Sequence, residues 1–211
     1  MEVQATNDFK EIITGRRSIR NYNPNYKISR KVMEEILEKA SLAPSSVNLQ
    51  PWRFLVIESK EGKETLASLA QFNQRQVRTS AAVIAIFVDM NSEFFLEYIY
   101  NKAVKEGYMP VEVKEKQAPA IKAMMETMTY ENKKEMNLID AGLVSMQLML
   151  AARAHGYDTN PIGGFEKDRI AEAFDLDKLR YHPVMLISIG KAAEKGYKSV
   201  RLPVDVIAQW K

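Results

Sequence analysis

The stretch "AAVIAIFVD" (81–89) is a run of small, β-branched and aromatic side chains that ends at Asp89. A run of this kind without alternating polar positions predicts a strand buried on both faces. Such a strand needs a layer of secondary structure on each side of its sheet. "PVMLISIGK" (183–191) has the same character, and "RFLVIE" (53–58) predicts a third strand. We therefore expect a small central sheet.

Helical patterns surround these strands and outnumber them. The first helix follows Thr6 or Asn7 as its N-cap and closes at Gly15, and Ser29 caps the next. His155 lies at the end of the most apolar helix, where a C-cap role is typical. The expected helices are 9–15, 30–42, 60–70, 92–106, 118–135, 137–155 and 166–175, with "GYDTNPIGGF" (156–165) as a loop. This pattern favours an α+β or α/β sandwich.

The chain is long enough for one domain with an excursion. We expect a single domain over 1–211, a helical excursion at about 90–135 and a C-terminal tail at about 197–211. Leu202, Val204, Ile207 and Trp210 suggest that the tail packs against something, although a solubilising tail is the alternative. Aromatic and methionine residues of the excursion are either walls of a binding pocket or core packing: Phe94, Phe95, Tyr98, Tyr108 and Met109.

The composition excludes several classes of function. Thirty basic and 27 acidic residues are interspersed, with a net charge of +3, so we expect neither nucleic acid nor membrane as a partner. The chain has no cysteine and no secretory pattern in residues 1–20, so we expect a cytoplasmic protein. Two histidines without helical spacing argue against a metal site, and GxSxG, Walker A and GxGxxG motifs are absent. An enzyme of this kind would depend on an organic cofactor.

Basic residues near both ends of the chain are candidates for binding one anion. "RRSIR" (16–20) places Arg16, Arg17 and Arg20 beside Ser18, and Arg201 follows Lys198 in the tail. Guanidinium groups form charge-assisted, bidentate hydrogen bonds with phosphate. The alternative is a pair of solvated basic turns.

Two further segments carry polar or permissive residues. In "PSSVNLQPW" (44–52) each proline disfavours helix in the residue before it, so we expect an extended segment that offers hydroxyls and amides. A capping and turn segment with Trp52 in the core is the alternative. In "NPIGGF" (160–165) the adjacent glycines allow a backbone N–H to approach a flat ligand, or form a plain turn.

Taken together, these segments resemble the nitroreductase family of flavin-dependent NAD(P)H oxidoreductases. The order matches over nearly the whole chain: "RRSIR", "PSSVNLQPW", "FNQRQ" (72–76), "PIGGF" (161–165) and "RLP" (201–203). The resemblance implies an α+β fold with a small, mostly antiparallel sheet flanked by helices. It also implies a homodimer with FMN at the subunit interface, held by both chains.

The resemblance assigns cofactor-binding roles residue by residue. It implies that a phosphate arm is formed by Arg16, Arg17, Ser18 and Arg201, and that Arg20 lies near the pyrimidine edge of the flavin. It implies that one chain donates Pro44, Ser45, Ser46 and Asn48 to the other chain's flavin. Contacts with the ring are implied for Asn73, Gly163 and Gly164, and cofactor binding for Gln76, Pro161 and Ile162. Gln76 and Gly163 stand where some members have a basic residue and a glutamate, so Arg20 would be the cation at that edge.

The implied activity is hydride transfer from NADH or NADPH to a nitroaromatic, a quinone or a flavin by a ping-pong mechanism, with no catalytic side chain and no metal. A dedicated reductase of an enoate, an aldehyde or a halogenated aromatic is the first alternative. A non-enzymatic flavin-storage or binding protein is the second.

Overall fold

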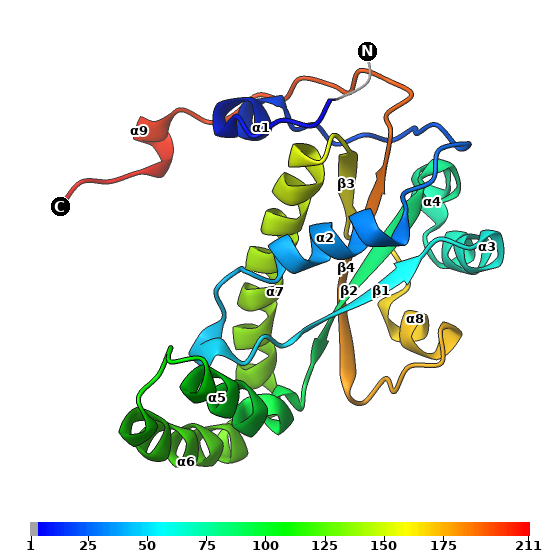
Figure 1. Cartoon of the computed structure of the whole chain (residues 1–211). Helices are drawn as coiled ribbons and strands as arrows, with labels where there is room; N and C mark the ends of the chain where they lie inside the picture. Colours follow the sequence, from blue (N-terminus) through cyan, green and yellow to red (C-terminus); the bar gives the residue numbers. More distant parts are fainter. Residues whose placement is uncertain (1–3) are drawn as a thin grey trace.

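The computed structural model describes residues 4–211. Its centre is one four-stranded sheet in the order β1-β2-β4-β3, in which every neighbouring pair is antiparallel. The strands are β1 (Trp52–Ile57), β2 (Ala82–Asp89), β3 (Asp158–Ile162) and β4 (Tyr181–Gly190). Helices cover both faces of this sheet, so the expected α+β sandwich with a small antiparallel sheet is confirmed (Figure 1).

All residues of β2 are buried, as its sequence predicts. Ile84 and Ile86 face one cluster, which includes residues of α2 (Arg30–Ala40) and α7 (Tyr130–Ala154). Val83 and Phe87 face the opposite cluster, which includes residues of α3 (Lys60–Leu69), α4 (Gln74–Thr79) and α8 (Lys167–Ala173). Successive side chains along a strand point to opposite faces of the sheet, and each face of β2 therefore packs against a different layer of helices.

The remaining elements are short, or lie away from the sheet. They are α1 (Phe9–Gly15), α5 (Leu96–Lys105), α6 (Val111–Thr127), α9 (Val204–Ile207) and the 3₁₀ turns η1 (Ser46–Asn48), η2 (Gln71–Asn73) and η3 (Ser92–Phe95). Ser29 caps α2 as expected. The N-cap of α1 is Asp8 rather than Thr6 or Asn7, because its carboxylate accepts the Glu11 N–H at 2.8 Å.

Several elements differ from the sequence-based prediction, among them α4, which was not expected. Residues 158–162, expected within a loop, form the edge strand β3. Helix α6 begins at Val111, within the expected linker, and α7 begins at Tyr130 rather than at 137. Proline at the edge of a sheet loses no ladder bond, which explains how Pro161 fits in β3.

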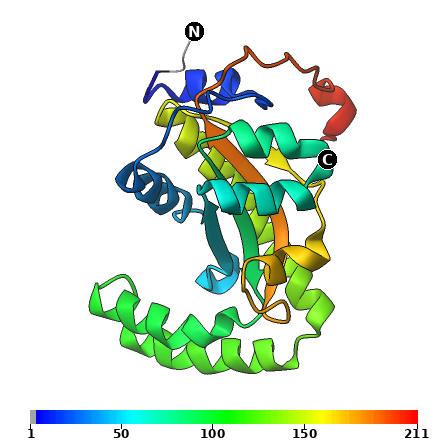
Figure 2. The same cartoon turned by 90° about the vertical axis from the view of Figure 1, so that its right-hand side faces the viewer.

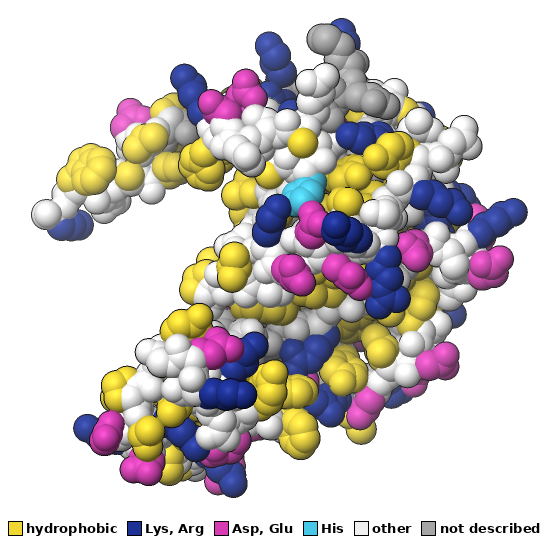
Figure 3. All heavy atoms as spheres, viewed as in Figure 1, with side chains coloured by type: hydrophobic (Ala, Val, Ile, Leu, Met, Phe, Trp, Pro, Cys, Tyr) yellow, Lys and Arg dark blue, Asp and Glu magenta, His cyan; other side chains and the backbone are white. Residues whose placement is uncertain are grey.

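Two parts of the chain project from opposite ends of the sheet. The hairpin formed by α5 and α6 lies at one end, and the segment that leads to α9 lies at the other (Figures 1 and 2). The surface between them is hollowed (Figure 3). The hairpin has a small core of its own, made by Leu49, Leu96, Tyr100, Ala118, Ile121 and Met125.

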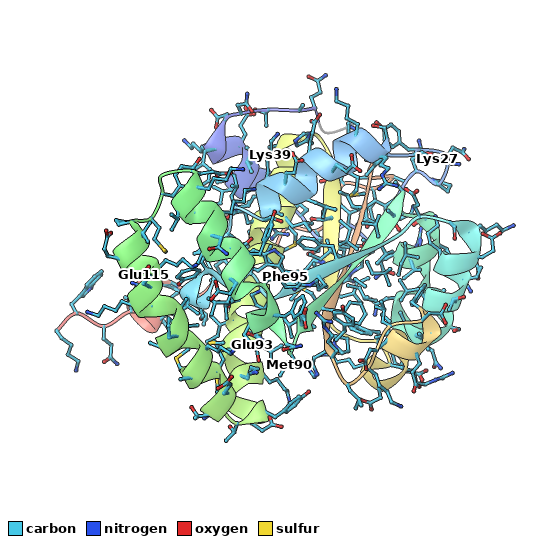
Figure 4. The ribbon with its side chains drawn as sticks, turned by 60° about the horizontal axis from the view of Figure 1, so that its bottom comes forward. Lys27, Lys39, Met90, Glu93, Phe95 and Glu115 are labelled. Atoms are coloured by element: carbon cyan, nitrogen blue, oxygen red, sulfur yellow. The ribbon has the colours of Figure 1, made fainter. Side chains whose placement is uncertain are left out.

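An ionic cluster around a buried carboxylate fixes the point where β2 ends and the chain leaves for α5. Asp89 is 0% exposed and accepts from Arg53 at 2.8 Å and from Arg180 at 2.9 Å. Arg53 also lies over the Phe95 ring, 4.9 Å from its centroid. Phe95 lies at the foot of the hairpin, directly before α5 (Figure 4). Burial by itself raises the pKa of Asp89, but hydrogen bonds from Arg180 and the Asn91 N–H, with the charges of both arginines, hold that pKa below its usual value.

Asp89→Ala should lower the free energy of unfolding by roughly 2–4 kcal/mol, because two guanidiniums lose a buried carboxylate. Urea unfolding near pH 7 measures this. Glu64→Ala is the control, because its pair with Arg78 at 2.9 Å is half-exposed and should contribute less than about 1 kcal/mol. Equal losses in the two variants would show that the Asp89 cluster adds no more than a surface pair.

The pH dependence of the same variants provides a second check. A carboxyl group with a depressed folded-state pKa stabilises the fold above its unfolded-state pKa of about 4, and this contribution is lost as pH falls through the lower folded-state value. The difference in stability between the wild type and Asp89→Ala should therefore shrink below about pH 4. A difference that stays constant there would contradict the assigned ionisation.

Candidate active site

The arginines from the two ends of the chain lie close together. Arg16 is the C-cap of α1, and its pKa lies below the usual value because its guanidinium is partly buried and because Arg201 and Arg17 add like charge nearby. The tail therefore passes beside the first arginine cluster. The two basic segments, which the sequence offered as candidates for binding one anion, therefore approach each other.

None of these three guanidiniums is neutralised by a carboxylate within residues 4–211. Arg17 donates to the carbonyl oxygens of Thr14 and Arg16, each at 2.8 Å. Arg201 donates to the Ser199 hydroxyl at 2.6 Å and to the Val200 carbonyl at 2.9 Å. A group of guanidiniums whose hydrogen-bond acceptors are all neutral oxygens favours binding of an anion with several acceptor oxygens.

Strand β3 leads from this cluster to the glycine pair. Ser18 lies opposite Thr159, and the Ile19 N–H donates to the Thr159 carbonyl at 3.1 Å. From Thr159 to Ile162 the strand advances about 10 Å, at 3.3 Å per residue. Pro161 on this edge strand is exposed, and Ile162 is buried beneath it. The outer edge of β3 thus connects a cationic end with a glycine end.

A chain of amide hydrogen bonds forms the glycine end. The Gln76 amide donates to the Asn73 side-chain oxygen at 3.1 Å, and the Asn73 amide donates to the Gly164 carbonyl at 3.1 Å. No heavy atom lies within 4 Å of the position that a Gly163 side chain would take, among the described residues. Three segments far apart in sequence therefore combine a neutral polar wall with open space beside a glycine.

The segment Pro44–Asn48 lies in another part of the fold, beside the middle of α7. Ser46 hydrogen-bonds to Asp140, in the middle of α7, whereas the Ala154 carbonyl at the end of α7 accepts from Thr6, just before α1. Asp140 and Ala154 are about 21 Å apart along the helix, at 1.5 Å per residue. Within one chain, this segment is thus separated from the arginine end of β3.

The expected extended form of this segment is wrong. It makes a 3₁₀ turn with left-handed backbone at Val47, Asn48 and Gln50, while Trp52 is buried in the core. The buried partner Asp140 was not identified from the sequence. It could have been found as the sole charged residue in the apolar run "MNLIDAGLVSMQLMLAA" (136–152). A carboxylate buried in such a run needs a hydrogen-bond donor.

The candidate wall residues divide into two groups. Phe95 contacts Arg53, and Met109 packs on the core of the hairpin. Phe94, Tyr98 and Tyr108 are exposed.

His155 is the C-cap of α7, as its position predicts, and lies 2.6 Å from the Lys39 ammonium. Within residues 4–211 no helix is long and apolar enough to cross a membrane.

Gly196 lets the chain pass closely behind the arginine arm. Its φ is +64°, and a Cβ there would lie 2.9 Å from the Arg17 Cβ and 2.8 Å from the Ile19 Cδ1. Gly107 has a similar φ of +75° but open space around it.

Gly107→Ala should therefore lower the free energy of unfolding only by the backbone strain, about 1 kcal/mol. Gly196→Ala should lower it by about 2–4 kcal/mol, since overpacking adds to the strain. Thermal unfolding of the pair tests this; equal losses would mean that the arginine arm moves aside freely.

Comparisons with known proteins identify the family of this chain. The model of the nitroreductase family matches residues 13–191. YdgI of Bacillus subtilis strain 168, provisionally named an NAD(P)H nitroreductase, is 66% identical over 98% of this chain and 99% of its own length. An enone reductase of CLA biosynthesis from Lactiplantibacillus plantarum is 34% identical over 93% of this chain and 91% of its own.

A solved structure extends the agreement to three dimensions. A provisionally assigned nitroreductase from Exiguobacterium sibiricum 255-15, crystallised in complex with FMN, is 64% identical, with a TM-score of 0.97 over 99% of this chain and all of that chain. The order of the motifs, the sheet and the matches in sequence and structure lead to one conclusion: this chain belongs to the nitroreductase family.

Proposed function

We propose that this protein is an FMN-dependent oxidoreductase that uses NADH or NADPH to reduce nitroaromatics, quinones or free flavins. The observation that carries the proposal is the site along β3, with unneutralised guanidiniums at one end and the amide chain beside the glycines at the other. Relatives named as NAD(P)H nitroreductases, and one crystallised with FMN, support it. The proposed kinetic order is ping-pong, in which the nicotinamide leaves before the oxidant binds.

The cationic end fits a phosphate monoester. Arg16, Arg17 and Arg201 would bind its oxygens with charge-assisted hydrogen bonds, and Ser18 would add a hydroxyl. A dianion beside Arg16 would also remove the mutual repulsion that lowers the pKa of this guanidinium.

The opposite end fits a flat polar heterocycle. Asn73 and Gln76 would present amide groups to its edge, and the backbone of Gly163 and Gly164 allows close approach. FMN, when bound, supplies the hydride chemistry of its ring. The chain's own residues bind and orient the ring, and Arg20 would supply a positive charge near the part that becomes anionic.

We propose that two chains complete each site as a homodimer. Ser46 contacts α7 at Asp140, about 21 Å along the helix from the end that lies beside the arginine arm, so Pro44, Ser45, Ser46 and Asn48 would serve the site of a second copy. Ile139, Leu143 and Met146 follow one another at helical spacing on the outer side of α7 and are exposed, Ile139 by 67%. Apolar side chains of the tail are also exposed, including Trp210 by 89%, which an isolated chain does not favour.

The α5–α6 hairpin would cover the pocket in this assembly. Phe94, Tyr98 and Tyr108 are the wall residues that remain free to contact a substrate. A dedicated enone reductase is a second candidate function, favoured by the named enone reductase among the relatives. Comparison of kcat/KM for an enone, a quinone and a nitroaromatic separates the two.

The proposed function predicts a yellow protein of twice the chain mass. The visible absorbance should bleach anaerobically on adding NADH or NADPH and return on adding a quinone. Visible spectroscopy with light scattering measures both properties. A colourless protein that does not take up added FMN would contradict the proposal, as would a flavoprotein that neither nicotinamide reduces.

Arg16→Ala combined with Arg201→Ala should raise the Kd for FMN about 100-fold or more, because each lost charge-assisted bond is worth about 1.5–3 kcal/mol. Quenching of flavin fluorescence on titration into apoprotein measures this. The matched control is Arg78→Ala with Arg169→Ala, which removes the same charge from guanidiniums that pair with Glu64 and Glu166. Unchanged affinity in the first double variant would refute the phosphate assignment.

A further inference from the structure

The segment between α2 and β1 is held in a costly backbone conformation. Val47, Asn48 and Gln50 all have left-handed backbone, with φ of 45°, 56° and 47°. Such residues cost roughly 1–3 kcal/mol each, and a β-branched valine is especially unfavourable there. Strain of this kind persists only where the surrounding structure imposes it. The source of that constraint is visible on either side of the segment.

Asp140 holds the segment from α7. Its side chain is 2% exposed, and the Ser46 N–H donates to both carboxylate oxygens at 3.1 Å. The Ser46 hydroxyl donates to Oδ1 at 3.4 Å. No lysine or arginine pairs with this carboxylate within residues 4–211. Burial raises the pKa of Asp140, and only the bonds from Ser46 oppose that rise.

A buried carboxylate without a cation is an expensive way to stabilise a fold. An apolar residue at position 140 would suit the surroundings on α7, where Ala141, Val144 and Leu148 are buried. Its only hydrogen-bonding partner among the described residues is Ser46. The carboxylate is therefore specific to this turn of the chain.

The α5–α6 hairpin holds the other end of the turn. Leu49 is 2% exposed and belongs to the core of the hairpin, and the Tyr100 hydroxyl donates to the Val47 carbonyl at 3.4 Å. Within the segment, the Gln50 N–H donates to the Ser45 hydroxyl at 3.0 Å. Val47 and Asn48 therefore lie between two fixed points, Ser46 on α7 and Leu49 on the hairpin.

We propose that Asp140 is a positioning residue for the cofactor, which fixes Ser46 and with it the left-handed turn that Ser46 and Asn48 present to the flavin of a second chain. The inference rests on the proposed function, because it takes the contact with flavin from there. It assigns to Asp140 an effect on cofactor affinity, although this side chain touches the segment and not the cofactor.

The test compares Asp140→Ala, Asp140→Asn and, as a control, Ser145→Ala. Ser145 is buried on the same helix, and its hydroxyl has no hydrogen-bond partner among residues 4–211. Hydrogen exchange, followed by mass spectrometry on apoprotein, reports the mobility of residues 44–50 without any cofactor. Titration of apoprotein with FMN reports affinity, and the circular dichroism of bound flavin reports its surroundings.

Asp140→Ala should speed exchange in residues 44–50 at least about 10-fold, leave the sheet unchanged, and raise the Kd for FMN about 10-fold or more. Asp140→Asn should recover most of both effects, because its amide oxygen still accepts the Ser46 N–H. Ser145→Ala should match the wild type. If Asp140 only stabilised the fold, Asp140→Ala would instead speed exchange throughout the chain. Asp140→Asn would then not restore slow exchange in residues 44–50 selectively.

Wild-type exchange in residues 44–50 of Asp140→Ala would overturn the proposal, and so would faster exchange with an unchanged Kd for FMN. If Asp140→Ala does not fold, Asp140→Leu, which fills the same space without an acceptor, provides the same comparison. Failure of the wild type to bind FMN would reject the proposed function itself. The exchange measurement would then still decide whether Asp140 fixes the turn.

Discussion

Burial of β2 on both faces is the constraint on which the rest of the molecule depends. Its apolar side chains alternate between two separate cores, so α2 and α7 must cover one face and α3, α4 and α8 the other. With the central strands enclosed in this way, the polar groups of the candidate site lie at the edge and ends of the sheet. The edge strand β3 and the loops around it are where the unneutralised guanidiniums and the hydrogen-bonded amides of Asn73 and Gln76 lie.

Strand β2 ends at a charged residue, Asp89, and a turn at Met90 and Asn91 follows it. Asp89 forms ion pairs with Arg53 and Arg180 at the junction between the sheet and the hairpin. Arg53 in turn contacts the Phe95 ring at the start of the hairpin. The hairpin is thereby attached to the sheet at a fixed point, although its own core is small. Because Leu49 completes that core, the orientation of the hairpin and the shape of the 44–50 turn are set together.

The sequence predicted those elements whose signal is local. β2 and β4 are recognisable because apolar runs bury both faces, and α2 because Ser29 precedes a regular apolar stripe. β3 was missed because a short edge strand with Asp158, Asn160 and Pro161 resembles a turn, and only pairing with β4 makes it a strand.

Long-range contacts explain the other differences. The prolines at 44 and 51 favour extended backbone at their neighbours, but Asp140 and the hairpin hold the turn between them in a left-handed form that no local rule predicts. The motif order indicated which residues belong to the candidate site, including both arginine clusters. It did not indicate how the site is divided within the chain, because the spacing of about 21 Å along α7 depends on the fold.

The proposed division of the site between two chains would link cofactor binding to assembly. If each flavin contacts the arginine arm of one chain and the 44–50 turn of another, the two equilibria share free energy, and each must strengthen the other by the same factor. Exposed apolar residues of the tail and of α7 would add burial worth roughly 1.5–3 kcal/mol for each fully covered side chain. Loss of the turn's shape would then weaken the dimer as well as the binding of cofactor. A residue such as Asp140, buried within one chain, would in this way influence an interface that it does not touch.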